Sequence, residues 1–456
     1  MNDYDVVIVG SGTAGQTAAF ALKAGGLKVA VVEKSDRPGG TCALAGCQPK
    51  KWYYEAAESI ARSRHLKGKG LTAALEGDWP AVYAQKTRFT SGVSKRTMDG
   101  LTQAGIDFLP GRARFLNETS MQVDKRRIEA GHFVLATGAR PMTLPIKGGA
   151  HMITSDRFFD LETLPPKILF VGGGFISFEL AHFAARIGSD RSRPLILEVG
   201  GRPLLQFDAQ MVDLLVDASG EEGIEVRTGM QIDSIEKEGE GLIVSVASGE
   251  TFETDLVVHG AGRVPNILDL DLAAAGIDHS PRGIVTDDGM RTSNPRVYAV
   301  GDCAATVQLA RVADYEALVA ARNILARPGR SEGKTVDYRA VPAILFTYPQ
   351  YGMVGATEDA LIRGGIDHHK SFGRNLGWPT YRRIGLRHAA YKLLVDPDGL
   401  FLGAHFIGDN TSGLLNTIRL AMINGITADE LYWQSIMSPY PTRESDLLYM
   451  LKSLVA

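Results

Sequence analysis

Two of the chain's three cysteines, Cys42 and Cys47, are close enough in sequence to form a redox couple. They lie five positions apart in the stretch GGTCALAGCQPKK. On a regular helix this spacing puts the Cα atoms roughly 7.5 Å apart along the axis, whereas a disulfide needs about 6.8 Å or less. The pair can bridge only where the turn is distorted, and Gly46 and Pro49 would permit this. The alternative reading is a small buried residue, which is what we expect for Cys303.

The composition is that of an ordinary globular protein. With 456 residues the chain should form two to four domains. Its net charge of −3 gives no support for a nucleic-acid partner. Three cysteines do not form a disulfide framework. The first residues lack the features of a signal peptide, and no apolar stretch is long enough to cross a membrane. We therefore expect a cytoplasmic protein that binds neither nucleic acid nor a membrane and holds no metal ion.

Residues 4–33 have the pattern of a dinucleotide-binding unit. An apolar run, a glycine turn, an Ala-rich helical stretch and a second apolar run follow one another, and the last run ends in Glu33. Gly10 would make the tight turn, Gly12 would let a pyrophosphate approach the backbone, and Gly15 would let the helix pack on the strand. The start of the helix would offer N–H groups to the phosphates.

The same pattern recurs at residues 167–198, so the chain should bind two dinucleotides. Gly172 and Gly174 are in place, but Ser177 stands where the third glycine belongs. Serine is small, which suggests a slightly loosened version of the same site. The second strand ends in Glu198, whose carboxylate can bond a ribose 2′-hydroxyl and would repel a 2′-phosphate. This favours NADH over NADPH.

The remaining chain suggests that one unit is inserted in the other. Residues 132–141 and 255–266 read as strands that end in glycine turns, and residues 296–304 form another buried strand far downstream. From about residue 335 the pattern changes to strands, a hairpin at DPDG and helices. We predict an α/β fold with two Rossmann-like domains, the second inserted in the first, followed by an α+β domain.

Taken together, the motifs resemble those of the flavin- and pyridine-nucleotide-dependent disulfide oxidoreductases. This family includes glutathione reductase, dihydrolipoamide dehydrogenase and mercuric reductase. The resemblance runs from residue 4 to about 450 and rests on the two glycine fingerprints and on GGTC....GC.PKK, ATGARP, GAGRVPN, YAVGD and VPAILFTYPQYGMVG. It implies an FAD-binding domain in two parts (1–147 and 268–334), an NAD(P)-binding domain (148–267) and a dimerisation domain (335–456).

The resemblance implies FAD in the first unit and NADH or NADPH in the second. Glu33 would bond the adenosine ribose, and Asp302 the ribityl chain. The residues expected at the two nucleotides are Gly10, Gly12, Gly15, Glu33, Lys34, Gly40, Thr41, Lys51, Ala113, Thr137, Gly138, Gly172, Gly174, Phe175, Glu179, Glu198, Gly262, Arg263, Gly301, Asp302 and Leu309.

The resemblance also assigns roles around the flavin. Cys47 would face the flavin and Cys42 the substrate, with the nicotinamide on the opposite flavin face. Lys51 matches the family's lysine near the reactive flavin nitrogen, and Glu179 its carboxylate partner. A positive charge there favours the reduced, anionic flavin. Phe175 stands where relatives often have a tyrosine that gates the nicotinamide site.

Near the C-terminus the chain departs from the family. Disulfide-reducing relatives carry His-Pro-Thr-x-Ser-Glu there, and the partner subunit supplies that histidine as the acid/base. Here the sequence is SPYPTRESD, with Tyr440 at the histidine position and Glu444 one residue short of the usual glutamate. A phenol, with a pKa near 10, is a poor base at neutral pH but can hydrogen-bond a thiol. Leu44 also replaces an asparagine that is common in relatives.

Three functions remain open from these residues. The leading one is an FAD-dependent, NADH-preferring enzyme that reduces a disulfide such as lipoamide, as a homodimer whose C-terminal domain completes the partner's active site. The second is reduction of a metal ion or a quinone. Mercuric reductases also have a tyrosine at this position, but they add a C-terminal cysteine pair, whereas this sequence ends LLYMLKSLVA. The third is a flavoprotein subunit that passes electrons to a protein partner.

Overall fold

The computed structural model describes residues 3–188, 192–326 and 333–455. The chain divides into two compact units, each built from several segments, and each unit is described by itself. The first unit consists of Met1–Trp52, Tyr83–Thr143 and Gly262–Asp337, and the second of Tyr53–Val82, Leu144–Ala261 and Tyr338–Ala456.

The first unit is built on a seven-stranded sheet. Its strands run in the order β3-β2-β1-β6-β5-β4, and β19 also pairs with β6. Strands β3, β2, β1, β6 and β19 are parallel, and β4 and β5 continue β6 as an antiparallel meander. Apolar runs buried on both faces are typical of such parallel strands. The strand bounds are β1 Tyr4–Val9, β2 Val29–Glu33, β3 Asp107–Pro110, β4 Ala113–Asn117, β5 Ser120–Val123, β6 Arg126–Leu135 and β19 Val297–Ala299.

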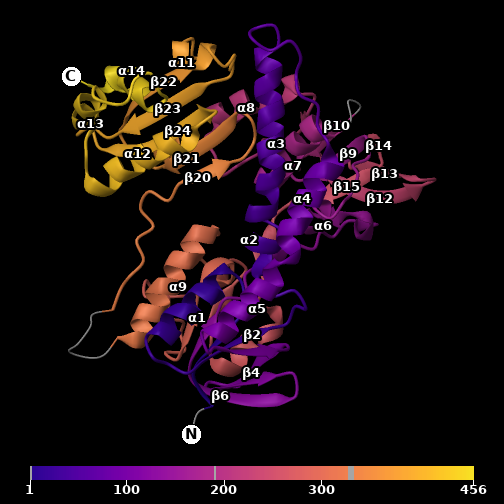
Figure 1. Cartoon of the computed structure of the whole chain (residues 1–456), viewed down its shortest axis with the longest axis vertical. Coiled ribbons are helices and arrows are strands. Elements are labelled where there is room, and N and C mark those ends of the chain that lie inside the picture. Colours follow the sequence, from indigo (N-terminus) through magenta and orange to yellow (C-terminus); the bar gives the residue numbers. More distant parts are fainter. Residues whose placement is uncertain (1–2, 189–191, 327–332, 456) are drawn as a thin grey trace. The chain divides into compact units, whose positions relative to one another are not determined.

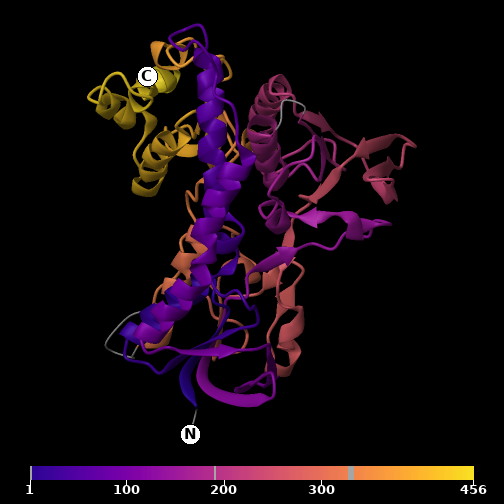
Figure 2. The same cartoon turned by 45° about the vertical axis from the view of Figure 1, so that its right-hand side comes forward.

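Helices and two small ribbons complete the first unit. Helix α1 packs along α9, and an antiparallel ribbon joins β7 to β16. Helices α3 and α4 continue into the second unit, and Figures 1 and 2 show α3 as one unbroken helix. The bounds are α1 Thr13–Ala24, α2 Gly40–Leu44, α3 Cys47–Leu66, α4 Trp79–Ser91, α5 Val93–Gln103, α9 Ala310–Leu325, β7 Ala139–Pro141, β16 Arg263–Pro265, β17 His279–Ser280, β18 Gly283–Ile284 and the 3-10 helices η2 Leu268–Leu270, η3 Leu272–Ala275 and η4 Gly301–Cys303.

The second unit contains another parallel sheet, of five strands in the order β11-β10-β9-β15-β8. All of its strand pairs are parallel. An antiparallel sheet, β12-β13-β14, extends from this half of the unit (Figure 1). The bounds are β8 Ile153–Thr154, β9 Lys167–Val171, β10 Arg193–Leu197, β11 Glu225–Arg227, β12 Ile232–Glu238, β13 Gly241–Val246, β14 Thr251–Thr254, β15 Leu256–His259, η1 Gly149–His151, α6 Ser155–Phe158, α7 Phe175–Ile187 and α8 Ala209–Glu221.

The same unit ends in an antiparallel sheet, β20-β21-β24-β23-β22. Helix α12 packs on β21 and β24, as Figure 1 shows in orange and yellow. The bounds are β20 Ala343–Leu345, β21 Gln350–Gly355, β22 His369–Arg374, β23 Ala390–Val395, β24 Phe401–Gly408, α10 Glu358–Arg363, α11 Pro379–Arg382, α12 Thr411–Asn424, α13 Ala428–Ser435, α14 Leu447–Leu451, η5 Glu444–Asp446 and η6 Lys452–Leu454.

The topology confirms the predicted fold class. Strands β6 and β19 are neighbours in the first parallel sheet, yet every strand of the second parallel sheet lies between them in sequence. One dinucleotide-type domain is therefore inserted in the other. Cys303 is buried, as predicted. Among the described residues, no helix combines the length and the apolar character needed to span a bilayer.

Candidate functional site

The first glycine turn leaves no room for side chains. Gly10 has φ +113°, and a Cβ built on it would lie 2.3 Å from the carbonyl oxygen of Ala136. A Cβ on Gly15 would lie 1.9 Å from the carbonyl oxygen of Gly10. Helix α1 begins after Gly12, and no side chain caps its first N–H groups. These groups are therefore available to an anion, as a pyrophosphate requires.

Both oxygens of the Glu33 carboxylate are held in place. Oε2 accepts hydrogen bonds from the backbone N–H of Ser11 at 3.0 Å and from its hydroxyl at 2.7 Å. Oε1 accepts one from the N–H of Ser35 at 2.9 Å. The hydroxyl of Ser11 accepts another from the N–H of Gly39 at 3.0 Å. The acid at the end of β2 is thus oriented beside the glycine turn, where a ribose hydroxyl would meet it.

A second glycine contact joins this turn to the helix that carries Cys42. Gly40, at φ +78°, opens α2, and a Cβ on it would lie 2.4 Å from the Cα of Gly12. The two backbones therefore touch with no side chain between them. A side chain at Gly40 would separate α2 from the turn, whereas a Cβ on Gly12 would lie 3.7 Å from the Cα of Gly40, in ordinary contact.

The helix that would contain both cysteines is broken between them. Helix α2 ends at Leu44 and α3 begins at Cys47, so Ala45 and Gly46 form the break. A Cβ on Gly46 would lie 3.1 Å from the carbonyl oxygen of Thr41, which is tighter than ordinary packing. The predicted distortion is present, and glycine permits it. Pro49, which was also expected to permit the distortion, lies outside the break, in the first turn of α3, where its missing N–H costs nothing.

The break brings the two thiols into contact. The hydrogen bond between Cys42 and Cys47, followed by burial, raises the pKa of the Cys42 thiol. Cys47 is the first residue of a twenty-residue helix, where the helix dipole favours a thiolate. The pair is therefore asymmetric: Cys42 holds its proton while the dipole favours negative charge on Cys47.

The segments that follow the central strands form a ribbon at the carboxyl end of the sheet. Residues 139–141 of β7 pair with residues 263–265 of β16. The guanidinium of Arg263 donates to the carbonyl of Ala139 at 2.7 Å. Gly138, at φ +66°, has nothing within 4 Å of a Cβ built on it. The predicted residues of this ribbon and its turns are Thr137, Gly138, Gly262 and Arg263.

Asp302 lies in the 3-10 helix η4, in a partly buried position before α9. Burial raises the pKa of its carboxyl, and the charge of Arg263 partly opposes this. Gly301 has φ +70°, and a Cβ built on it would lie 3.1 Å from the Cβ of Ala313 in α9, which is tighter than ordinary packing. Leu309 caps α9 at its N-terminus.

Two further predicted residues of the first unit lie in β4 and directly after β2. Ala113 is buried in β4. Lys34 is 3.2 Å from a carboxylate oxygen of Asp269, with which it forms an ion pair.

The second glycine turn repeats the main backbone hydrogen bonds of the first. The N–H of Gly172 donates to Leu197 at 2.8 Å, as that of Gly10 donates to Val32 at 2.8 Å. Glu198 accepts from the N–H of Gly173 at 2.5 Å through Oε2 and from that of Gly200 at 2.6 Å through Oε1. The acid is again oriented through both oxygens. Gly174 caps α7 without a side-chain hydrogen bond.

The serine in place of the third glycine is compensated across the turn. In the first unit Gly15 faces the Cβ of Ala136. The equivalent of Ala136 is Gly260, because each donates its N–H to the last residue of the first strand at 2.9 Å. A Cβ on Gly260 would lie 1.9 Å from the hydroxyl oxygen of Ser177. In the first unit the glycine is on the helix, at Gly15, and in the second unit it is on the facing strand end, at Gly260. Each turn therefore has one glycine at this contact, and the close packing is retained.

The residues expected near the nicotinamide belong to α7. Phe175 is the first residue of the helix, and 47% of it is exposed, so its ring is accessible for stacking. Glu179 is buried, and one of its oxygens accepts the N–H of Phe346 at 2.9 Å. Lys51 lies in the first turns of α3, partly exposed. The roles predicted for Lys51 and Glu179 stay predictions.

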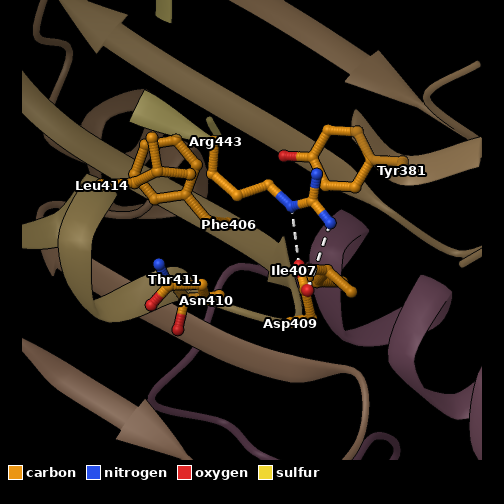
Figure 3. A pocket seen from close by; sticks show the side chains of 9 residues that line it. Tyr381, Phe406, Ile407, Asp409, Asn410, Thr411, Leu414 and Arg443 are labelled. Atoms are coloured by element: carbon orange, nitrogen blue, oxygen red, sulfur yellow. Dashed lines mark hydrogen bonds and ion pairs between the residues drawn. The ribbon is translucent and has the colours of Figure 1, made fainter. Parts of the chain in front are cut away.

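An ion pair anchors the segment that carries Tyr440. Arg443 donates through Nε to Oδ1 of Asp409 at 2.7 Å and through a terminal nitrogen to Oδ2 at 3.1 Å (Figure 3). Its guanidinium lies 4.2 Å from the ring centre of Tyr381. The two hydrogen bonds to Asp409 and the contact with the Tyr381 ring fix the position of Arg443 and of the chain segment around it. Tyr440 itself is 77% exposed.

Glu444 lies against the start of α12. The side-chain amide of Asn410 donates to its Oε1 at 3.4 Å. A Cβ on Gly413 would lie 2.1 Å from the same oxygen, so Glu444 covers the first turn of that helix. A carboxylate is favoured at this position by the helix dipole. The predicted joint role of Tyr440 and Glu444 stays a prediction.

The ion pair between Arg443 and Asp409 was not predicted from the sequence. Asp409 directly follows β24, the last strand of the C-terminal sheet, and Arg443 lies thirty-four residues farther on. No periodic pattern links them. An arginine beside the motif position of Tyr440 was the only local signal.

The residues of both turns fit dinucleotides. Each turn offers uncapped helical N–H groups and a carboxylate fixed through both oxygens. In the first turn, Gly12 and Gly40 leave the backbone bare on the side that faces the redox helix. These are the groups that a pyrophosphate and a ribose need.

Comparison with known proteins agrees with this geometry. Residues 4–317 match the family model described as pyridine nucleotide-disulphide oxidoreductase, and residues 341–448 match the dimerisation domain of the same family. The chain is 30% identical to a mercuric reductase of Lysinibacillus sphaericus, over 98% of this chain and 82% of the relative. It is 31% identical to a dihydrolipoyl dehydrogenase of Bacillus subtilis, over 94% of this chain and 92% of the relative.

A solved structure has the same fold along the whole chain. It is the Cu(II) complex of the HOCl-induced flavoprotein disulfide reductase RclA from Escherichia coli. The TM-score is 0.88 with 25% identity, and the match covers 100% of both chains.

Proposed function

Because the chain belongs to the pyridine nucleotide-disulphide oxidoreductase family, we propose that it oxidises NADH and passes the electrons to a disulfide through Cys42 and Cys47. Enzymes of this family depend on FAD and use pyridine nucleotides. The flavin would supply the conversion of a hydride into an electron pair that can reduce a disulfide. The finer assignments, NADH as donor and a disulfide as acceptor, are the proposal.

One observation carries the proposal. The two thiols are in contact at a break between helices, and the first helix begins with a backbone contact to the dinucleotide turn. Two cysteines kept only for packing would need neither the break nor the contact. A redox pair needs both, since the sulfurs must reach each other and also the cofactor.

In the disulfide exchange, the two cysteine thiols supply the two electrons that reduce the substrate disulfide. The Cys42 sulfur, once deprotonated, attacks one sulfur of the substrate and forms a mixed disulfide, and the first substrate thiolate leaves. The Cys47 sulfur then attacks the Cys42 sulfur, which releases the second substrate thiolate and forms the Cys42–Cys47 disulfide. Two protons, one of them from the Cys42 thiol, convert the released thiolates into thiols. The raised pKa of Cys42 means that a group near it must accept its proton.

We place the NADH adenosine at the second turn, with its ribose on Glu198. A carboxylate that is fixed through both oxygens is complementary to a 2′-hydroxyl and repels a 2′-phosphate. Arg202 is the nearby cation, and its guanidinium donates to the carbonyls of Leu205 and Phe207 at 3.2 Å each. These two hydrogen bonds hold its guanidinium on the loop.

Replacing Glu198 by alanine should lower kcat/KM for NADH about tenfold and that for NADPH little, because only the ribose hydroxyl loses a partner. Steady-state rates with both coenzymes test this. Glu253→Ala is the matched control, because Glu253 is an exposed glutamate in the same unit, paired with Lys167. A wild-type preference for NADPH would contradict the assignment.

We propose a homodimer in which Tyr440 of one subunit reaches the cysteine pair of the other. The match to the family's dimerisation domain and the exposure of Tyr440 on an anchored segment support this. The enzyme would work in the cytoplasm, where NADH is regenerated.

Reduction of a thiophilic or redox-active metal ion is the second candidate. Tyr440 favours it, because a phenol is a poorer base at neutral pH than the histidine of disulfide-reducing relatives. The 30% identity to a mercuric reductase supports the same reading. In this case the two thiolates would bind the metal ion as substrate.

A screen of electron acceptors separates these functions. We expect NADH oxidation by the pure holoenzyme to be fastest with a disulfide, among lipoamide, glutathione disulfide, Hg(II), Cu(II) and quinones. Tyr440→His should then raise the rate with lipoamide about tenfold near neutral pH, because it restores a base, whereas Tyr440→Phe should not. Faster turnover with Hg(II) or Cu(II), slowed by Tyr440→Phe, would favour the metal reading. Activity only with a co-purified protein would point to a protein partner.

A further inference from the structure

A buried lysine lies in β23, an inner strand of the C-terminal sheet. All six residues of β23 are buried, and the Lys392 side chain is 1% exposed. Its Nζ is 2.7 Å from Oδ1 of Asp208 and 2.6 Å from Oε2 of Glu358. A lysine is rarely buried unless it is paired. Both of its partners come from other elements, Asp208 from the start of α8 and Glu358 from α10.

Asp208 ends the loop that follows the ribose carboxylate. We call residues 199–207 the nucleotide loop, because it begins directly after Glu198. The Asp208 carboxylate caps α8 by accepting the N–H of Met211 at 3.3 Å, and it accepts the N–H of Glu358 at 3.1 Å. With Lys392 as third donor, the carboxylate ties the loop end, α10 and β23 together.

The middle of the nucleotide loop contacts the second glycine turn. Leu204 donates its N–H to the carbonyl of Gly173 at 2.9 Å, and it is buried with φ +50°. A non-glycine residue keeps such a conformation only where its surroundings impose it. The N–H of Gly200 donates a hydrogen bond to Oε1 of Glu198 at 2.6 Å. The shape of the loop therefore decides where the ribose carboxylate and the turn lie.

A neutral chain of hydrogen bonds supports the same anchor. The N–H of Asp208 donates to the hydroxyl of Tyr351 at 3.1 Å. That hydroxyl lies 3.3 Å from Nδ1 of His405, whose Nε2 lies 3.0 Å from the carbonyl of Ala356. A carbonyl only accepts, so Nε2 carries the proton and Nδ1 accepts from the tyrosine. Burial lowers the pKa of His405, which keeps this arrangement neutral.

We propose that Lys392 is a positioning residue for the nicotinamide nucleotide: it fixes the nucleotide loop to the C-terminal sheet and so holds Glu198 and the second glycine turn in their binding geometry. This inference rests on the proposed function, because it takes the second turn as the nucleotide site. It adds that the nucleotide affinity depends on a residue of the dimerisation domain that does not touch the nucleotide.

The test measures nucleotide binding directly. NAD⁺, and NADP⁺ in parallel, are titrated calorimetrically into the FAD-loaded wild-type enzyme and into Lys392→Met. We expect the dissociation constant for NAD⁺ to rise about tenfold. KM for NADH should rise equally, while KM for the acceptor and kcat at saturating NADH change less than twofold. Amide hydrogen exchange should become faster in residues 199–211.

Two further variants complete the test, one as a control and one for the case that Lys392→Met does not fold. Lys147→Met removes another ion pair of the same unit, between Lys147 and Glu236 at 2.7 Å, on the surface, and should leave NAD⁺ binding unchanged. If Lys392→Met does not fold, the triple variant Asp208→Asn, Glu358→Gln, Lys392→Met removes the unpaired charges and keeps a helix cap. It should show the same weak binding.

Two outcomes decide between the ideas. NAD⁺ binding within twofold of the wild type, in Lys392→Met or in the triple variant, would overturn the inference. A wild-type enzyme that binds neither NAD⁺ nor NADP⁺ would instead overturn the proposed function.

Discussion

Replacing Cys47 by serine is expected to abolish the reduction of any acceptor that needs the dithiol, with a loss on the order of 10³-fold or more in kcat. The thiolate favoured at the start of α3 is lost, and Cys42 cannot form an internal disulfide alone. Anaerobic reduction with NADH should give a thiolate-to-flavin charge-transfer absorbance in the wild type and none in Cys47→Ser. Titration of thiols after reduction should find two additional thiols only in the wild type.

The other two cysteines provide the controls. Cys42→Ser should lose acceptor reduction but keep the absorbance, because Cys47 is the sulfur expected at the flavin. Cys303→Ser should behave as the wild type. Its buried sulfur donates to the carbonyl of Leu135 at 3.2 Å, and a hydroxyl can do the same. Charge-transfer absorbance that survives Cys47→Ser would refute the assigned order of the two sulfurs.

Replacing Gly10 by alanine should have the second largest effect, loss of the FAD-loaded enzyme. The new Cβ would lie 2.3 Å from the carbonyl oxygen of Ala136, and φ is +113°. Neither backbone can move without opening the turn between β1 and α1. We expect FAD content, measured by absorbance after gel filtration, to fall about tenfold or more, and the free energy of unfolding to fall by about 3 kcal/mol.

Gly26→Ala separates the clash from the backbone conformation. Gly26 has φ +86°, but nothing lies within 4 Å of a Cβ built on it. The variant should cost roughly 1 kcal/mol of stability and keep its FAD. Equal FAD loss in both variants would mean that left-handed backbone strain, and not the close approach, decides flavin retention.

The sequence predicted what local patterns encode. Buried strands, glycine turns and terminal acids lie within thirty residues of one another, and Glu33 and Glu198 were found in this way. The break between the cysteines was also predictable, because five positions on a regular helix exceed the reach of a disulfide. Its place could not be predicted, since either Gly46 or Pro49 could have produced it.

The features that were missed depend on residues far apart in sequence. From the sequence, Ser177 suggested a looser version of the glycine turn. Only the fold shows that Gly260 makes room for the serine side chain. Lys392 lies within an apolar run of the sequence. A lysine in such a run usually indicates a position of an edge strand that is exposed to solvent. Its partner Asp208 lies 184 residues away. Such pairs carry no periodic signal, because packing between domains creates them.

The contact between Gly12 and Gly40 has a consequence for engineering the acceptor. Because two backbones meet there, no rotamer is available to adjust the geometry between the cofactor turn and the redox helix. Electron entry should therefore tolerate almost no substitution at Gly40. Tyr440 is exposed on a separate, anchored segment, where side chains can change without disturbing that contact. New acceptor specificities should thus be found by randomising the 436–440 stretch, with the hydride-accepting half of the enzyme left intact.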